Sequence, residues 1–185
     1  NAFLLEQKAV GGEATISLIQ FDDQYEVNYV AADIQDAQDL NEATYQPRGM
    51  TALLDAMGRT IASTRKRVEE SKEAADVVIV ITTDGLENAS EEYSRGQIHD
   101  LIEHCEKQLG WKFIFLAADE ASFAQHEGLG MNPERSFRTG RGAAAFENAS
   151  ALMSTKVGDF RRHRSVKALA FTPEERKEAD GLDQE

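Results

Sequence analysis

The fold of this 185-residue chain is decided by one stretch, Val77-Val78-Ile79-Val80-Ile81-Thr82-Thr83-Asp84-Gly85. Its five successive apolar residues, mostly β-branched, predict a strand buried on both faces, as in a parallel sheet covered by helices. The strand then ends in hydroxyl groups, a carboxylate and a glycine. Functional residues of such sheets lie at the carboxyl ends of the strands, so the residues after Ile81 are the first candidates for a site.

Helical and strand patterns alternate on both sides of this stretch. Apolar residues that recur every three or four positions predict helices over 1–10, 51–72, 91–109, 120–127 and 143–160. Further strands are predicted over 14–21, 25–29, 113–118 and 136–139. The turn Asp22-Asp23-Gln24 joins the first two strands into an antiparallel hairpin. The alternation after residue 50 predicts an α/β domain with a mostly parallel sheet.

The amino-acid composition argues against several classes of function. Lys and Arg number 20 against 33 Asp and Glu, a net charge of −13, which argues against a general nucleic-acid or anionic-membrane binder because phosphate contacts need clustered cations. The 41% apolar residues are enough for one sizeable core. No apolar run approaches the roughly 18 residues of a membrane helix. Cys105 is the single cysteine, so no intrachain disulfide forms, and a cytoplasmic location is our expectation.

Two loops at the predicted edge of the sheet carry oxygen groups that could bind the same cation. Pro47-Arg48-Gly49-Met50-Thr51 leads into a helix, so Thr51 is predicted to be its N-cap, with the hydroxyl facing the strand ends. Asp84 places a carboxylate at the tip of the buried strand. A hydroxyl and a carboxylate suit a hard cation such as Mg²⁺. Ordinary capping and turn formation are the alternative for both loops, and they stay open at this point.

Taken in chain order, these features resemble a von Willebrand factor A (vWA) domain of the stand-alone bacterial or phage type. The resemblance covers roughly residues 1–160 and rests on Gly11-Gly12, Phe21-Asp22-Asp23, Gly49-Met50-Thr51-Ala52-Leu53-Leu54-Asp55-Ala56, Thr83-Asp84-Gly85-Leu86-Glu87-Asn88 and Phe115-Leu116-Ala117-Ala118-Asp119. It implies a doubly wound, Rossmann-like sheet with one antiparallel edge strand and helices on both faces. Residues 161–185 would then be a charged, partly helical tail.

The resemblance also implies a site. In the family, a metal-ion-dependent adhesion site draws on three loops; Thr51 matches the second loop and Asp84 the third, so both are predicted metal ligands. The surrounding positions are predicted to form a partner-binding rim: Asp22, Gly49, Met50, Gly85, Glu87, Asn88 and Asp119. The expected ion is Mg²⁺, or else Mn²⁺ or Ca²⁺, and only if the first loop is present.

The first loop is where the sequence departs from the family. The Asp-x-Ser-x-Ser motif that the family carries in this loop does not occur in residues 1–185. Either the sequence begins downstream of the motif or the protein lacks it; the helical opening at Asn1, without a Met, favours the first explanation. In the family, the first strand lies between the strands matching 14–21 and 77–82. Without it, two strand edges lose a partner, so the 185 residues alone are expected to be marginally stable or aggregation-prone.

The resulting expectation is a protein-binding adhesion or scaffold module rather than an enzyme. Its partner is expected to present an Asp or Glu carboxylate; neither nucleic acid nor membrane is expected, and the oligomeric state stays open. One alternative is an α/β enzyme or a nucleotide or phosphate binder that uses the same rim, since Gly140-Arg141-Gly142-Ala143-Ala144-Ala145 fits a dinucleotide pattern. The run before that pattern is polar, and the rim carboxylates would repel phosphate. The other alternative is a vWA-fold remnant without metal function.

Overall fold

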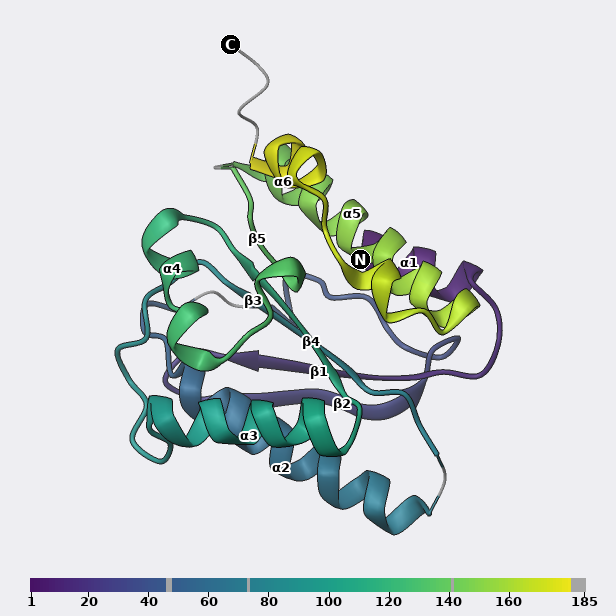
Figure 1. Cartoon of the computed structure of the whole chain (residues 1–185), viewed down its shortest axis with the longest axis horizontal. Helices are drawn as coiled ribbons and strands as arrows, with labels where there is room; N and C mark the ends of the chain where they lie inside the picture. The colour runs from purple at the N-terminus through teal and green to yellow at the C-terminus, as the bar shows by residue number, and fades with distance from the viewer. Residues whose placement is uncertain (46–47, 73, 141, 181–185) are drawn as a thin grey trace.

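The computed structural model describes residues 1–45, 48–72, 74–140 and 142–180, and its helices and strands alternate along the chain (Figure 1). The helices are α1 (Ala2–Ala9), α2 (Leu53–Ser71), α3 (Arg95–Gln108), α4 (Glu120–Ala124), α5 (Ala143–His163) and α6 (Pro173–Asp180). The strands are β1 (Thr15–Phe21), β2 (Tyr25–Asp33), β3 (Val78–Thr83), β4 (Lys112–Ala117) and β5 (Ser136–Arg138). Short 3₁₀ helices lie at Glu127–Leu129, Pro133–Arg135 and Val166–Leu169. The predicted helices and strands are confirmed in type, with ends that differ by a few residues.

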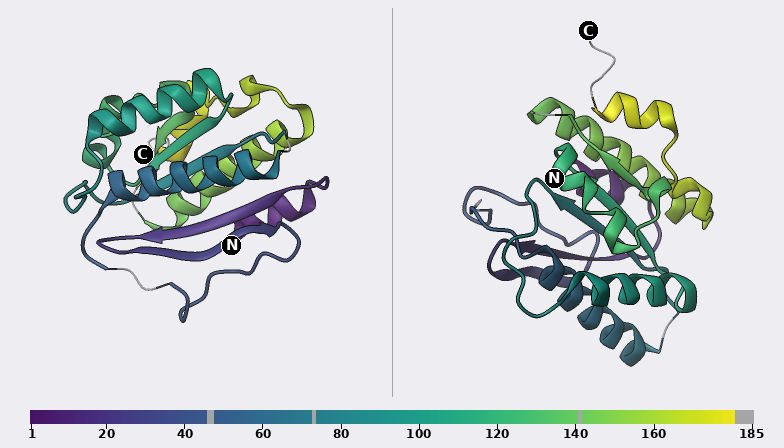
Figure 2. Two further views of the ribbon diagram at one scale, coloured as in Figure 1. Left: turned by 90° about the horizontal axis from the view of Figure 1, so that it is seen from below. Right: turned by 60° about the vertical axis from the view of Figure 1, so that its left-hand side comes forward.

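The strands form two sheets. β3, β4 and β5 make a parallel sheet in that order, with Val78 opposite Lys112 and Phe115 opposite Ser136. β1 and β2 form the predicted antiparallel hairpin, which stands apart from the parallel sheet (Figure 2). Parallel pairing and the hairpin are therefore confirmed. One continuous, doubly wound sheet remains a prediction.

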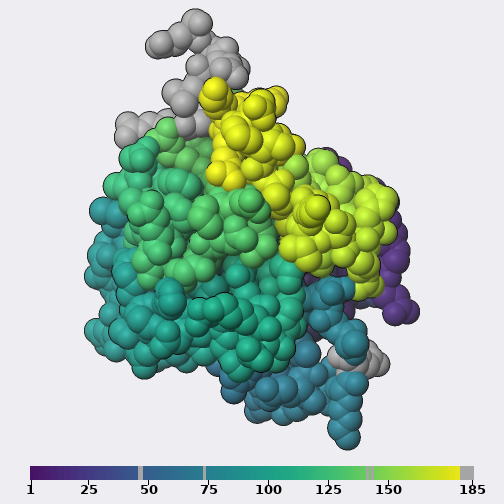
Figure 3. Space-filling model, viewed as in Figure 1, coloured from purple at the N-terminus to yellow at the C-terminus, as the bar shows by residue number. Residues whose placement is uncertain are grey.

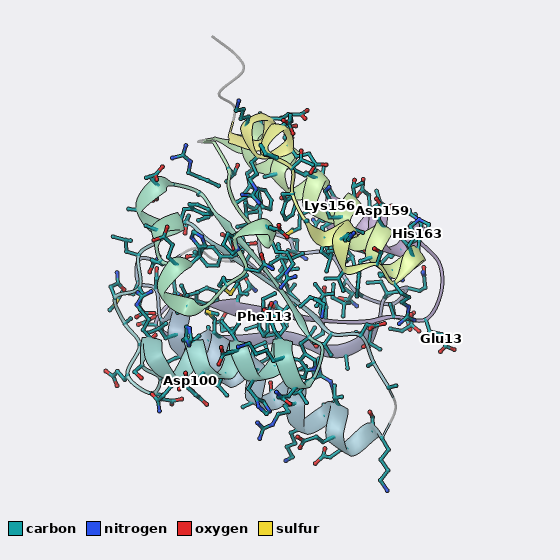
Figure 4. The ribbon with its side chains drawn as sticks, in the orientation of Figure 1. Glu13, Asp100, Phe113, Lys156, Asp159 and His163 are labelled. Carbon is teal, nitrogen blue, oxygen red and sulfur yellow. The ribbon has the colours of Figure 1, made fainter. Side chains whose placement is uncertain are left out.

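Helices cover both faces of the parallel sheet, because β4 is apolar on both. Phe113 and Phe115 pack with residues of α2 and α3, while Ile114 and Leu116 pack with residues of α5. Figure 4 shows Phe113 on the side of the sheet that faces α3. Burial of one such side chain contributes about 2–3 kcal/mol, so a strand between two helical layers is best built from an uninterrupted apolar run.

β3 is less buried than its sequence predicts. Ile81 is buried, but Val78, Ile79 and Val80 are only partly buried and Thr82 is exposed, so the expectation of burial on both faces is wrong for this part of the strand. The reason is a missing neighbour: among the described residues β3 pairs only with β4, and β1 only with β2. Each strand therefore keeps one open edge, as the resemblance implied.

α1 ties the hairpin to α5. Leu4 is buried in a small cluster that includes Ile16 and Tyr29 of the hairpin. One turn further along the helix, Gln7 donates to the backbone oxygen of Ser154 at 2.8 Å, and Arg161 donates to the backbone oxygen of Gln7 at 2.6 Å. The hairpin is thus held in place by a helix rather than by strand pairing.

The α5 helix packs with its middle and C-terminal turns. Ala149, Met153, Val157 and Phe160 are buried. Phe146 shares their helical spacing but is 45% exposed. It stands in the first turn, ahead of the part of the helix that meets the sheet.

Residues beyond α5 return to the domain. Phe171 is buried against Phe137 of β5, with ring centroids 4.2 Å apart, and Lys156 of α5 forms a 2.7 Å ion pair with Glu175. Figure 3 shows this C-terminal segment in yellow against the green surface around β5 and α5. α5 itself runs through the predicted boundary at residue 160, and the division into a domain and a tail stays a prediction.

Candidate binding rim

The loops predicted to share a site lie side by side. The Thr51 N–H donates to the Asn88 side-chain oxygen at 2.9 Å, and the Asn88 N–H donates to the Thr51 backbone oxygen at 3.0 Å. The Ala52 N–H donates to the Asp22 backbone oxygen at 2.6 Å, which adds the end of β1. We call residues 48–52 and 84–88 the binding rim.

Within the binding rim, the Thr51 hydroxyl lies against the backbone of Gly85. A Cβ at position 85 would collide with the Thr51 hydroxyl oxygen, so a larger residue does not fit there without displacing it. Asp84 is the preceding residue; it is exposed, and within the described ranges no hydrogen bond or ion pair engages its carboxylate. The structure thus brings Thr51 beside the Asp84–Gly85 turn.

Thr51 is not the N-cap of α2, so that prediction is wrong. Ala52 occupies the cap position, without a side-chain hydrogen bond. The first turn is capped from the loop after β3 instead: the Leu54 N–H donates to Glu87 at 2.9 Å and the Asp55 N–H donates to the Ser90 hydroxyl at 3.1 Å. These contacts satisfy two of the first N–H groups of the helix and leave the Thr51 hydroxyl free of a capping role.

Glu87 is engaged by the fold. Besides Leu54, its carboxylate accepts from the Ala89 N–H, the Ser90 N–H and the Ser90 hydroxyl at 2.8–3.0 Å. Burial raises the pKa of the Glu87 carboxyl, but the hydrogen bonds stabilise its charged form more, and the net pKa lies below its ordinary value. Any contact of Glu87 with a partner would compete with these bonds.

Asp55 anchors the continuation of the same loop, and sequence reasoning missed it. Its buried carboxylate accepts backbone N–H groups of Glu91, Glu92 and Tyr93 at 2.9, 3.0 and 2.9 Å. Burial raises its pKa, while these three N–H groups and the nearby Arg59 lower it more, so the net pKa is lowered. The available signal was a single carboxylate within the otherwise apolar run 52–58.

Gln125, at the C-terminal end of α4, is a second residue that the sequence did not single out. Its buried side chain donates to the Gly85 backbone oxygen at 3.1 Å and accepts from the Glu87 N–H at 2.7 Å. The backbone on both sides of Leu86 is therefore fixed. No local pattern links positions 85 and 125, because only the folded chain brings them together.

Two further predicted rim carboxylates also have partners within the chain. Asp22 is buried, accepts from the Gln24 N–H at 2.6 Å and forms an ion pair with Arg48. Asp119 is the N-cap of α4 and accepts from the Ser122 N–H at 2.8 Å. Of the remaining predicted rim positions, Gly49, Met50 and Asn88 are exposed. A partner-binding role for any of them stays a prediction.

The described residues supply only part of a metal site. Thr51 and Asp84 offer one hydroxyl and one carboxylate, whereas Mg²⁺ takes six oxygen ligands, several of them waters. No group of three Asp, Glu, His or Cys side chains suited to a metal ion occurs among residues 1–45, 48–72, 74–140 and 142–180.

Comparison with known protein families identifies the family of this chain. A family model described as the von Willebrand factor type A domain matches residues 4–151. The chain belongs to the von Willebrand factor type A domain family. This membership implies an α/β, Rossmann-like fold and, typically, a protein-interaction role that often depends on a metal; vWA domains are generally not enzymes. A search of curated proteins finds no match.

A helix that spans a membrane is both long and apolar. None of the helices in the described part of the chain combines the two properties.

Proposed function

We propose that this vWA domain binds a protein partner at the binding rim, with the Asp84 carboxylate at the centre of the contact. The observation that carries the proposal is the packing of the Thr51 hydroxyl against Gly85. It sets the Thr51 hydroxyl against the residue that follows Asp84, whose exposed carboxylate the fold does not use, at the carboxyl end of a parallel strand. Such strand ends are where open α/β sheets bind their ligands.

Rigidity of the loop supports this proposal. Glu87, Gln125 and Asn88 fix the residues around Asp84 by the hydrogen bonds described above. A site that is already ordered loses less conformational entropy when a partner binds. The Asp84 loop therefore has the character of a prepared binding surface.

A divalent cation is proposed to assist binding, with Mg²⁺ preferred over Mn²⁺ or Ca²⁺. Thr51 and Asp84 would supply two of its oxygen ligands. The others would come from water, from an Asp or Glu of the partner, and from an Asp-x-Ser-x-Ser loop where the protein carries one. We also propose a cytoplasmic location and a relationship to the stand-alone bacterial and phage vWA proteins.

A phosphate-binding or enzymatic role for the rim is less well supported. Arg48, the basic residue of the rim, is engaged by Asp22 and, at 3.0 Å, by Glu26, so its charge is already balanced. The dinucleotide-like pattern near residue 140 includes Arg141, which lies outside the described residues. A vWA-fold remnant without metal function remains the second candidate, because the described metal ligands are incomplete.

Partner capture by the full-length protein tests the proposal. We expect capture in Mg²⁺, loss of capture in EDTA, and loss in Asp84→Ala with an unchanged melting temperature. Glu13→Ala is the matched control, since Glu13 is an exposed carboxylate ahead of β1, on a different side of the molecule (Figure 4). Unchanged capture by Asp84→Ala would reject the proposal, and capture that is indifferent to EDTA would favour the remnant.

A further inference from the structure

The last turn of α5 and the 3₁₀ helix that follows it are basic, whereas the chain as a whole is acidic. Residues 161–172 hold four of the 20 Lys and Arg residues and none of the 33 Asp and Glu residues. Arg162, Arg164 and Lys167 are exposed and lie on this one short stretch of chain. We call these three residues the basic patch.

The basic patch lies on a backbone that the fold holds in place. The Arg164 N–H donates to the Phe160 backbone oxygen at 2.7 Å and closes the last turn of α5. Phe160 before the patch and Leu169 after it are buried in the same apolar cluster. Arg161 is used by the fold, because it donates to the backbone oxygen of Gln7 at 2.6 Å. An ordered surface of this kind loses little conformational entropy when a ligand binds.

The helix dipole does not account for the whole patch. A cation near the C-terminus of a helix is favourable because the dipole is negative there, which explains Arg162. Lys167 lies beyond the end of α5, in the 3₁₀ helix Val166–Leu169, where the effect of the dipole has fallen off. Burial and, after it, the positive charge of Arg162 lower the pKa of Arg161. A negatively charged ligand would relieve this repulsion between neighbouring cations.

The guanidinium groups of the basic patch already bind carboxylates within the chain. Arg162 forms a 3.0 Å ion pair with Asp159, and Arg164 forms one with Asp76. The four side chains are between 43% and 72% exposed, and ion pairs at such exposed positions contribute little to stability. They can therefore be exchanged for carboxylates of a ligand. Among the described residues, no ion pair engages Lys167.

The basic patch and the binding rim lie at opposite ends of β3. Asp76, which pairs with Arg164, precedes this strand, whereas Asp84 follows it. The six residues of β3 span about 20 Å. Figure 4 labels His163, which belongs to the same turn as the patch, at the end of α5. A ligand of the basic patch therefore does not occupy the binding rim.

We infer that the basic patch binds an acidic peptide segment of a protein partner, independently of the binding rim. The two arginines and the lysine take its Asp and Glu side chains in charge-assisted hydrogen bonds. Nucleic acid or an anionic membrane fits less well, because its phosphates continue beyond the patch and meet a chain of net charge −13. An acidic segment of a few residues confines its charge to the patch.

Fluorescence polarisation tests the inference with a fluorescein-labelled oligoglutamate peptide and its oligoglutamine counterpart. The full-length protein is titrated into each peptide at low salt, where attraction between exposed charges is least screened. We expect the oligoglutamate to bind and the oligoglutamine not to bind. The Arg162→Gln, Lys167→Gln double variant should weaken oligoglutamate binding about tenfold, with an unchanged melting temperature. Equal binding of the two peptides, or oligoglutamate binding that survives this double variant, would overturn the inference.

Controls separate the basic patch from net charge, from phosphate and from the binding rim. Arg65→Gln, Lys66→Gln removes the same charge from exposed positions of α2 and should change the affinity by less than about twofold. An equal loss in both double variants would overturn a local patch. Tighter binding of oligodeoxythymidylate or of phosphatidylserine vesicles would overturn the choice of a peptide. Affinity should be equal in Mg²⁺ and in EDTA at matched ionic strength, and a loss in EDTA would overturn independence from the binding rim.

Discussion

The Thr51 hydroxyl oxygen lies so close to the backbone of Gly85 that a Cβ at position 85 would collide with it. This contact joins the loop before α2 to the loop after β3, and the reciprocal hydrogen bonds between Thr51 and Asn88 lock it. It explains why a glycine follows Asp84. It also places a hydroxyl and a carboxylate at the same edge of the sheet.

Gly85→Ala should displace the Thr51 hydroxyl and disturb the binding rim. The added methyl group overpacks a tied-down loop, which should lower the free energy of unfolding by about 1–3 kcal/mol in urea titrations. Partner binding should weaken with it. Gly49→Ala is the control, because a Cβ there meets no atom within 4 Å, and its effect on stability should stay within about 0.5 kcal/mol. Equal effects of the two substitutions would disprove the tight contact.

Stability should fall in acid through Asp55 and Glu87. The folded chain lowers the pKa of both carboxyls, so between the folded and unfolded pKa values the unfolded state binds more protons. Their contribution is complete at neutral pH and is lost as the pH falls below about 4 and through the lowered folded values. Urea midpoints measured from pH 7 to pH 3 should therefore drop less steeply in Glu87→Gln and Asp55→Asn. Glu13→Gln, which removes an exposed carboxylate, is the control. Urea midpoints that fall with pH as steeply in both variants as in Glu13→Gln would contradict the prediction.

Mg²⁺ should bind the 185-residue chain weakly or not at all. Thr51 and Asp84 supply only two oxygen ligands, and the described residues offer no cluster of three ligating side chains. Calorimetric titration should show little or no heat beyond dilution. Tight uptake of Mg²⁺ would mean that the ion has other ligands in this chain.

The open edges of β1 and β3 should make the 185-residue chain associate as its concentration rises. Each edge presents unpaired backbone donors and acceptors to another chain. Light scattering should detect species that grow as the protein concentration rises. These species should also bind an amyloid dye. A clear solution of monomers at high protein concentration over several days would show that the edges are protected.

Local patterns predicted the elements, because burial and periodicity act over neighbouring residues. The apolar run of β4 predicted a strand, and the alternation around Tyr25 predicted the hairpin. The capping box Ser94–Gln97 at the start of α3 was also readable from spacing alone, although it was not predicted. The strand-end rule predicted that Thr51 and Asp84 share an edge, and the contact with Gly85 agrees with it.

Features set by tertiary structure could not be predicted in this way. The bond from Gln125 to Gly85 joins residues 40 positions apart, and no local pattern encodes it. Thr82 is exposed because, among the described residues, β3 has a neighbouring strand on one edge only. Phe146 has the right helical spacing for burial, but spacing does not reveal where α5 meets the sheet.

A double-mutant cycle between Thr51→Val and Asp84→Asn asks directly whether the two side chains form one site. The affinity of the protein for a peptide selected against it from a random phage-displayed library would be measured in Mg²⁺ for the natural protein, both single variants and the double variant. If the hydroxyl and the carboxylate serve the same ion and partner, the double variant should bind no more weakly than Asp84→Asn alone. If the fold losses of affinity of the two single variants simply multiply in the double variant, the two positions act independently, which would contradict a shared site.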